Sequence, residues 1–152
     1  QNMGAEKYDR IGKGLKSAVG MGFAVSVLCF VLAIFFGKQL TMLFVDASET
    51  TIISYSYQFL LYCTGGYCLL TLVNTVRFTI QGMGFSIFAI LAGVMEMLAR
   101  SIVAFSLVPA IGFLGACFAS PFAWIMADVF LIPAFFHVHK KLQKKFAAHI
   151  AL

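Results

Sequence analysis

Charged residues are scarce in this sequence, and this scarcity excludes a water-soluble domain. Asp, Glu, Lys and Arg make up 11% of the 152 residues, against about 25% in soluble domains. Apolar residues reach 61%, above the about 45–50% that is usual for a soluble chain. So few charges cannot cover an exterior that faces water, whereas a chain surrounded by lipid needs no polar exterior within the hydrocarbon layer. The composition predicts an all-α integral membrane protein.

The sequence also lacks the motifs of metal sites and of catalysis. No C-x-x-C spacing occurs, and the four cysteines all fall in apolar segments, where they are expected to pack as small residues: Cys29, Cys63, Cys68 and Cys117. No Ser/His/Asp arrangement, glycine-rich phosphate loop or pair of catalytic carboxylates is present. We therefore expect no enzyme, no metal, no cofactor and no nucleic-acid partner. The chain opens on Gln1 and a polar stretch without a signal peptide, which suggests a piece of a longer protein.

Four long apolar stretches are present, and each is long enough for the about 20 residues that cross a bilayer as a helix. They cover residues 17–40, 52–76, 86–108 and 113–136. The connections between them are short, so neighbouring helices must be antiparallel. The sequence predicts a four-transmembrane-helix bundle over residues 17–138, between a cytoplasmic or interfacial linker at 1–16 and a cytoplasmic basic tail at 139–152.

Basic residues set the expected orientation, because Lys and Arg in short loops stay on the cytoplasmic side. They gather in the leader, in the linker that begins at Arg77 and in the tail: Lys7, Arg10, Lys13, Lys16, Lys140, Lys141, Lys144 and Lys145. Both termini are therefore expected in the cytoplasm. In the leader, Tyr8, Ile11 and Leu15 share one helical face, which fits either a short helix at the membrane interface or a solvated linker.

Three ionisable residues fall inside the expected spans, where charge is costly and usually faces protein or a water-filled cavity. Glu96 and Arg100 are four residues apart and can pair on one face. Ala89, Ala92, Gly93 and Val103 share that face, which we expect to pack in protein. The opposite face is expected to meet lipid: Ile87, Ile90, Leu91, Leu98, Ile102 and Phe105. The pair is either an internal salt bridge or part of an ion or substrate pathway.

Asp128 is the third intramembrane charge, and it shares a helical face with Cys117, Pro121 and Trp124. Pro121 is expected to kink the helix. A kink beside a carboxylate marks either an ion site or an Asp that is hydrogen-bonded to Trp124 or to a neighbouring helix.

The second expected helix carries a polar stripe instead of charges. Its members are Thr51, Ser54, Gln58, Tyr62 and Gly65. The stripe is either a set of ordinary hydrogen bonds between helices or a cavity wall that offers hydrogen bonds and an aromatic face to a bulky cationic drug.

Several sequence strings together resemble the multidrug and toxin extrusion (MATE) family. They are QNMGAEKYDR at residues 1–10, LFVD at 43–46, RFTIQGMG at 77–84, the Glu96-x-x-x-Arg100 pair, GFLG at 112–115 and SPFAW at 120–124. Their order and spacing agree with that family along the chain.

The resemblance implies helices nine to twelve of a twelve-helix transporter with two lobes. Such a protein is a secondary antiporter in the cell membrane, which exports drugs or organic cations in exchange for Na⁺ or H⁺ by alternating access. Its partners would be lipid, the missing N-terminal lobe and the exported compound. A carboxylate on the tenth helix, tied to cation coupling in one branch, has no counterpart here. A lipid-linked precursor flippase of the same superfamily, a small four-helix exporter and a non-transport structural subunit are the alternatives.

Overall fold

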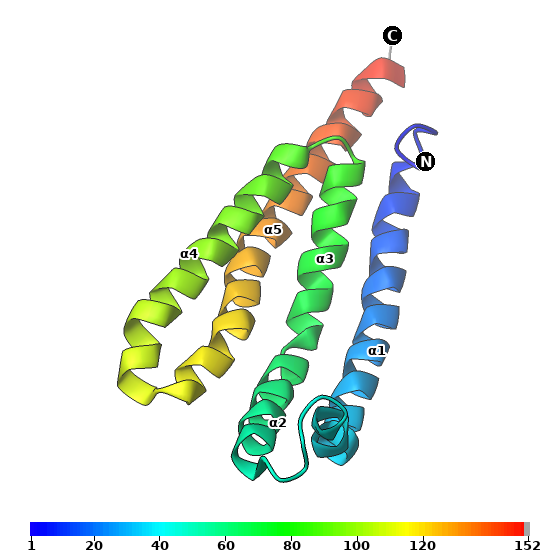
Figure 1. The fold of residues 1–152 in the computed structure, drawn as a ribbon. Helices are drawn as coiled ribbons and strands as arrows, with labels where there is room; N and C mark the ends of the chain where they lie inside the picture. The colour runs from blue at the N-terminus through cyan, green and yellow to red at the C-terminus, as the bar shows by residue number, and fades with distance from the viewer. Residues whose placement is uncertain (151–152) are drawn as a thin grey trace.

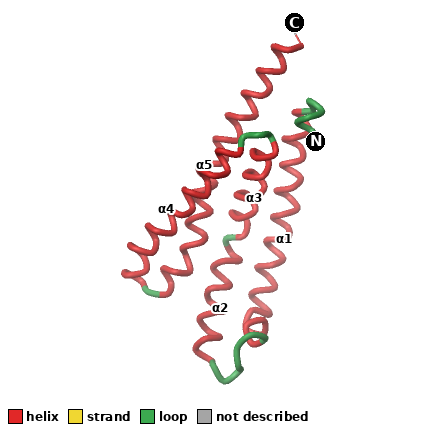
Figure 2. The backbone as a smooth tube through the Cα atoms, turned by 45° about the horizontal axis from the view of Figure 1, so that its top comes forward, coloured by secondary structure: helices red, strands yellow, loops and turns green. Residues whose placement is uncertain are grey.

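The computed structural model describes residues 1–150, with side chains up to Lys144, and these residues form five helices. They are α1 (Tyr8–Met42), α2 (Thr50–Gly65), α3 (Tyr67–Gly82), α4 (Ser86–Ile111) and α5 (Phe113–Ile150). Figure 1 shows them as a bundle in which α2 and α3 follow one another along a single path. Apart from short turns, the described chain is helical throughout (Figure 2).

The chain crosses the long dimension of the bundle four times. The start of the chain, the end of α5 and the α3–α4 turn lie at one end, here called the terminal end. The α1–α2 loop and the α4–α5 turn lie at the other, here called the loop end (Figure 1). Helices α1, α4 and α5 are each long and apolar enough to span a membrane, and α2 with α3 passes the same test as one broken span. The expected membrane helical bundle is confirmed.

The first helix differs from the expectation for the leader. α1 runs without a break from Tyr8 to Met42, so residues 8–16 are not a separate interfacial helix or a solvated linker. Tyr8 and Ile11 are buried in the main hydrophobic core, together with Met83 just beyond the end of α3. Their apolar face is therefore covered by protein and not by the membrane surface. The expected tail likewise continues the last helix, since α5 extends to Ile150.

The second crossing is bent at a pair of glycines. α2 ends at Gly65 and α3 begins at Tyr67, with an angle of 49° between the two helices. Gly66 lies under the ring of Trp124, and a Cβ atom there would be 2.9 Å from Cζ3 of that ring. The bend occurs where glycine weakens the helix and permits this close approach. The crossing covers residues 50–82 in place of the expected 52–76.

Small residues determine how the helices pack. α4 and α5 form the most extensive contact, and alanines on both helices are buried, among them Ala92, Ala99, Ala123 and Ala127. Gly115 begins this contact, because its Cα lies against the backbone of Leu107 and Val108 in the last turns of α4. α1 meets α3 through Ser26, whose hydroxyl is hydrogen-bonded to that of Thr71 at 3.0 Å. Close packing through small side chains is typical of membrane helices.

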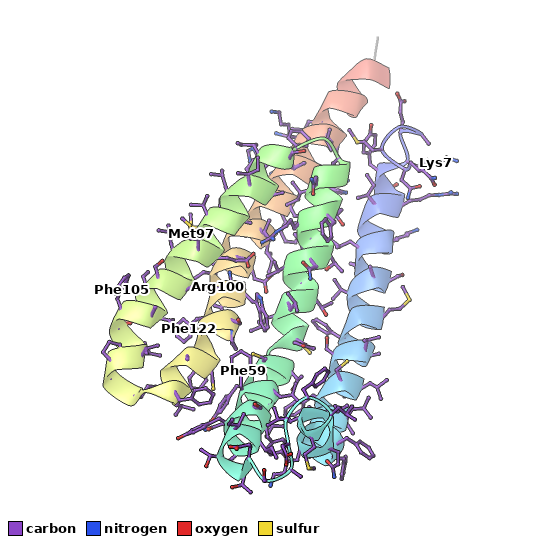
Figure 3. All side chains as sticks on the ribbon, in the orientation of Figure 1. Lys7, Phe59, Met97, Arg100, Phe105 and Phe122 are labelled. Atoms are coloured by element: carbon purple, nitrogen blue, oxygen red, sulfur yellow. The ribbon has the colours of Figure 1, made fainter. Side chains whose placement is uncertain are left out.

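The outward faces are apolar, as expected for α4. All six residues expected to meet lipid on α4 are exposed in this chain, and Phe105 reaches 85%. Met97 and Phe105 point away from the other helices in Figure 3. Ala92 and Val103 are buried as expected. Gly93 was expected on the protein-facing side, but this was wrong: it is exposed, and nothing lies within 4 Å of where its Cβ would be.

Candidate functional site

A groove runs along the loop-end half of the bundle between α1, α2 and α5. Its volume is about 850 Å³. Three of the predicted pathway residues line it, namely Ser54, Gln58 and Tyr62, and Gly65 and Gly66 complete its α2 side. Its remaining lining residues are Phe30, Ile34, Tyr57, Leu61, Leu69, Phe118 and Pro121. Thr51, the first member of the predicted stripe, does not line this groove.

The groove offers aromatic faces together with a hydrogen-bonding group. The rings of Tyr62 and Phe118 pack against each other with centroids 4.9 Å apart, so α2 and α5 are in contact along one wall of the groove. Tyr57 donates a hydrogen bond to the carbonyl oxygen of Ile34 at 3.2 Å, which fixes its ring against α1. Gln58 is half-buried, and its amide has no hydrogen-bond partner within the described chain. The interpretation of the stripe as a network of interhelical hydrogen bonds is therefore not supported for Gln58.

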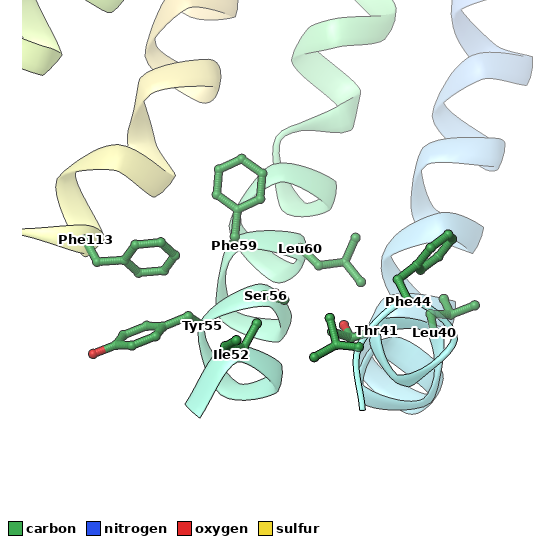
Figure 4. Close-up of a pocket in the computed structure, with 10 residues that line it drawn as sticks. Leu40, Thr41, Phe44, Ile52, Tyr55, Ser56, Phe59, Leu60 and Phe113 are labelled. Carbon is green, nitrogen blue, oxygen red and sulfur yellow. The ribbon is translucent and has the colours of Figure 1, made fainter. Parts of the chain in front are cut away.

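A second hollow lies at the loop end and is almost wholly apolar. It has a volume of about 720 Å³ and lies between the end of α1, the start of α2 and Phe113 of α5 (Figure 4). Tyr55 and Phe113 pack there with ring centroids 4.8 Å apart. Thr41 also lines this hollow, but its hydroxyl already donates a hydrogen bond to the carbonyl oxygen of Gly37 at 2.9 Å.

Charged side chains from α3 and α4 meet in the terminal half of the bundle. Glu96 accepts a hydrogen bond from Arg100 at 3.3 Å, as the four-residue spacing predicted. Its other carboxylate oxygen accepts a hydrogen bond from Arg77 of α3. The Glu96 side chain is 12% exposed and that of Arg77 is 21% exposed, against 45% for Arg100. The main partner of Glu96 is therefore on another helix, and the ion pair joins α3 to α4.

Arg77 is the member of the charge cluster that the sequence analysis missed. The sequence placed it in a loop at residues 77–85, but α3 continues to Gly82 and carries Arg77 inside the bundle. The available signal was the apolar pattern around it, since Val73, Val76 and Ile80 are all buried on α3 at helical spacing. A predicted helix that included residues 73–80 would have placed Arg77 in the membrane, with Glu96 as a candidate partner.

Asp128 lies next to this charge cluster but forms no hydrogen bond in it. Its side chain is buried, with 5% of the residue exposed, and neither carboxylate oxygen has a hydrogen-bond partner within the described residues. The hypothesis of a hydrogen bond to Trp124 or to another helix was therefore wrong. The carboxyl still interacts electrostatically with Arg77 and Glu96. The structure thus brings together Glu96, Arg100 and Asp128, and it adds Arg77.

One face of α5 connects the groove to the charge cluster. Pro121 lines the groove, Trp124 lies one turn further along, and Asp128 follows after another turn. Trp124 packs against Gly66 at the bend and against the ring of Tyr67, with centroids 6.2 Å apart. An indole ring therefore separates the inner end of the groove from the buried carboxyl group.

The four cysteines form no disulfide, and Cys117 is buried. Among the side chains that the structure describes, residues 1–144, no group of three or more His, Cys, Asp and Glu could hold a metal ion.

A comparison with protein families identifies the chain. The family model described as MatE matches residues 1–106, which include α1 to α3 and most of α4. Among curated proteins and solved structures, no match to this chain was found. The match covers four of the six strings quoted above; the strings at 112–115 and 120–124 lie outside it. Since the matched residues exceed half of the sequence and the helices form a multi-pass membrane bundle, the chain belongs to the MATE family of membrane transporters.

Proposed function

We propose that the chain belongs to a secondary antiporter that exports amphipathic or cationic drugs across the cell membrane. Export is driven by Na⁺ or H⁺ moving in the opposite direction, and the transporter alternates between inward-open and outward-open states. The groove is the observation that carries the proposal. Its aromatic rings attract organic cations, and its apolar walls suit the rest of a drug molecule.

The unpartnered amide of Gln58 adds specificity to the groove. A bound compound with a hydrogen-bonding group would satisfy this amide beside the rings of Tyr62 and Phe118. Ligand pockets typically combine apolar walls with a few placed polar groups. Ser54, Gln58 and Tyr62 are therefore the substrate-contacting residues that we assign to α2.

The charge distribution supports one orientation in the membrane. Seven of the described basic side chains belong to the terminal end: Lys7, Arg10, Lys13, Lys16, Lys140, Lys141 and Lys144. The α1–α2 loop at the other end carries Asp46 and Glu49. We therefore place both ends of this chain in the cytoplasm and the groove in the outer half of the membrane.

The outward apolar surface supports two kinds of partner. α1 exposes large side chains along most of its length, including Val25, Leu28, Leu32, Phe35 and Phe36. α4 exposes another such face around Ile102 and Phe105. We assign these surfaces to membrane lipid and to a second, N-terminal lobe of the same transporter, which would provide the opposite wall of the groove.

Efflux from vesicles tests the proposal. The complete transporter is reconstituted in lipid vesicles, and export of ethidium, a fluorescent organic cation, is followed after a pH or Na⁺ gradient is applied. We expect Tyr62→Ala and Gln58→Ala to lower the rate by about tenfold each, the equivalent of about 1.4 kcal/mol of lost interaction with the substrate. Phe105→Leu on the lipid-facing side of α4 is the matched control and should keep the wild-type rate.

The apolar pocket at the loop end favours one alternative substrate. Its lining from Leu40, Phe44 and Phe59 would suit the hydrocarbon chain of a lipid-linked precursor (Figure 4). If vesicles moved such a lipid between leaflets while ethidium stayed inside under both gradients, the flippase function would replace drug export.

A further inference from the structure

Two complementary groups in the charge cluster lack hydrogen-bond partners. Nε of Arg77 is a buried donor without an acceptor, and both oxygens of Asp128 are buried acceptors without a donor within the described residues. The two side chains come from α3 and α5, which pack against each other. Buried polar groups are nearly always paired, so a pair of unsatisfied opposite groups calls for an explanation.

The surroundings of Asp128 leave few groups that control its charge. α3 contributes Arg77 and α4 contributes Glu96 and Arg100, whereas α2 holds no charged residue and α1 holds none between Lys16 and Lys38. The ring of Tyr67 faces Trp124 one turn away. With Asp128 ionised, two arginines balance two carboxylates; with Asp128 protonated, the cluster carries one net positive charge. A carboxylate without donors is poorly solvated, whereas a carboxylic acid has no charge to solvate.

We propose that Asp128 binds the coupling proton of the transporter and that Arg77 changes its partner from Glu96 to Asp128 when the proton leaves. This inference rests on the proposed function, because it assigns the ion and the ion site of the same antiporter. The proton forms an O–H bond with a lone pair of one Asp128 oxygen. On release, the guanidinium of Arg77 replaces it, and Glu96 keeps Arg100 as its counter-charge.

The chemistry of the site favours a proton over a sodium ion. Hard cations need several oxygen ligands at once. Asp128 provides two oxygens, while those of Glu96 are both taken by arginines. Two guanidinium groups in the same cluster would also repel a metal cation. A proton needs only one oxygen.

The position of the site suggests how proton and drug are linked. Trp124 lies between Pro121 in the groove and Asp128, and its ring rests on Gly66 where α2 meets α3. Movement of Arg77 toward Asp128 would pull on α3, the helix that begins at this bend, so the bend and the groove would respond to the proton.

Trp124 provides a direct test, because it is the only tryptophan in the sequence. The complete transporter, with any tryptophan outside this chain replaced by phenylalanine, is reconstituted in phosphatidylcholine vesicles, and its fluorescence is titrated between pH 5 and pH 9. We expect a single step in emission that Asp128→Asn abolishes and Asp128→Glu retains. Glu49→Gln, in the exposed α1–α2 loop, is the control and should keep the step. A wild-type chain without a step, or a step that persists in Asp128→Asn, would overturn the proposal.

Arg77 is tested as a positioning residue in the same titration. Arg77→Gln should move the midpoint by about one pH unit or more, because a neighbouring charge is lost, and Arg77→Lys should restore it to within about half a unit. An unchanged midpoint in Arg77→Gln would contradict the exchange of partners. Replacing choline chloride by sodium chloride should leave the midpoint in place, and a shift with Na⁺ would favour a sodium site.

Transport by the complete protein separates this inference from the proposed function. If the inference holds, Asp128→Asn loses ethidium export driven by a pH gradient but keeps exchange of labelled for unlabelled ethidium. Wild-type protein that moves no ethidium under either gradient would refute drug export while the fluorescence step remains. Wild-type export with a pH-driven rate unchanged in Asp128→Asn would refute only the assignment of the proton site.

Discussion

Gly115 is the position where the packing of α4 and α5 gives the sharpest prediction. A Cβ atom at residue 115 would lie 2.7 Å from the carbonyl carbon and oxygen of Leu107 and 2.8 Å from the amide nitrogen of Val108. These neighbours are backbone atoms within a helix, so they cannot turn aside as a side chain can. Gly115→Ala must therefore separate the two helices at the start of their contact.

The expected cost follows from the distances. Overpacking a well-packed site costs about 1–3 kcal/mol, and we expect the upper end of that range because the backbone must move. For a chain of this size, about 3 kcal/mol corresponds to a melting temperature lowered by about 6 °C or more. Buried Cys117 lies two residues further on. In a background whose other cysteines are replaced by alanine, the reaction of a fluorogenic maleimide with the Cys117 thiol on heating reports the loss of packing.

Gly93 provides the matched control on α4. Nothing lies within 4 Å of a Cβ at that position, so Gly93→Ala adds a methyl group without a clash. Alanine is the better helix former by about 1 kcal/mol, and the control should melt at or slightly above the wild-type temperature. If Gly115→Ala melted within about 2 °C of the wild type, the close approach of α5 to the α4 backbone would be wrong.

Three further results are expected. Gly66→Ala should straighten the α2–α3 bend or displace Trp124, because the added Cβ would lie 2.9 Å from the Trp124 ring. Gly65→Ala is the control, because its Cβ would meet the ring of Phe30 at an ordinary 3.5 Å. We expect lower ethidium export in Gly66→Ala and normal export in Gly65→Ala, and equal export in both would contradict this reasoning. Glu96→Gln should destabilise the chain by about 3 kcal/mol, because it leaves Arg77 unpaired. Arg100→Gln should cost about 1 kcal/mol or less, because the Arg100 side chain is more exposed. Unfolding in detergent would measure both costs, and equal values would contradict the assignment of Arg77 as the main partner of Glu96. In the α1–α2 loop, hydrogen bonds from the backbone N–H and the hydroxyl of Ser48 lower the pKa of Asp46 below 3.8. These bonds therefore stabilise the loop at neutral pH, and this stabilisation is lost as the pH falls through the lowered pKa. Ser48→Ala should raise the pKa of Asp46 toward 3.8 in an NMR titration, and an unchanged pKa would show that the hydroxyl contributes nothing.

The sequence alone determined the class of the protein and the number of membrane crossings. Uninterrupted apolar stretches of this length indicate membrane-spanning helices, because a spanning helix needs about 20 residues whereas a spanning strand needs only about 9–11. The spacing of Glu96 and Arg100 placed them on one face, and the polar stripe of α2 placed Ser54, Gln58 and Tyr62 together, because both patterns depend only on the helical repeat. The quoted strings also identified the family.

Only the tertiary structure decided which residues of different helices meet. Arg77 and Glu96 are 19 residues apart on different helices, and no local pattern could pair them. The ring that packs on Gly66 at the bend is that of Trp124, which comes from a helix much later in the chain. The carboxyl group of Asp128 likewise lacks a hydrogen-bond partner because no donor from α3 or α4 lies within hydrogen-bond distance of it. Helical periodicity fixes the direction of a side chain about its own axis, whereas the packing of several helices fixes the partners that it meets.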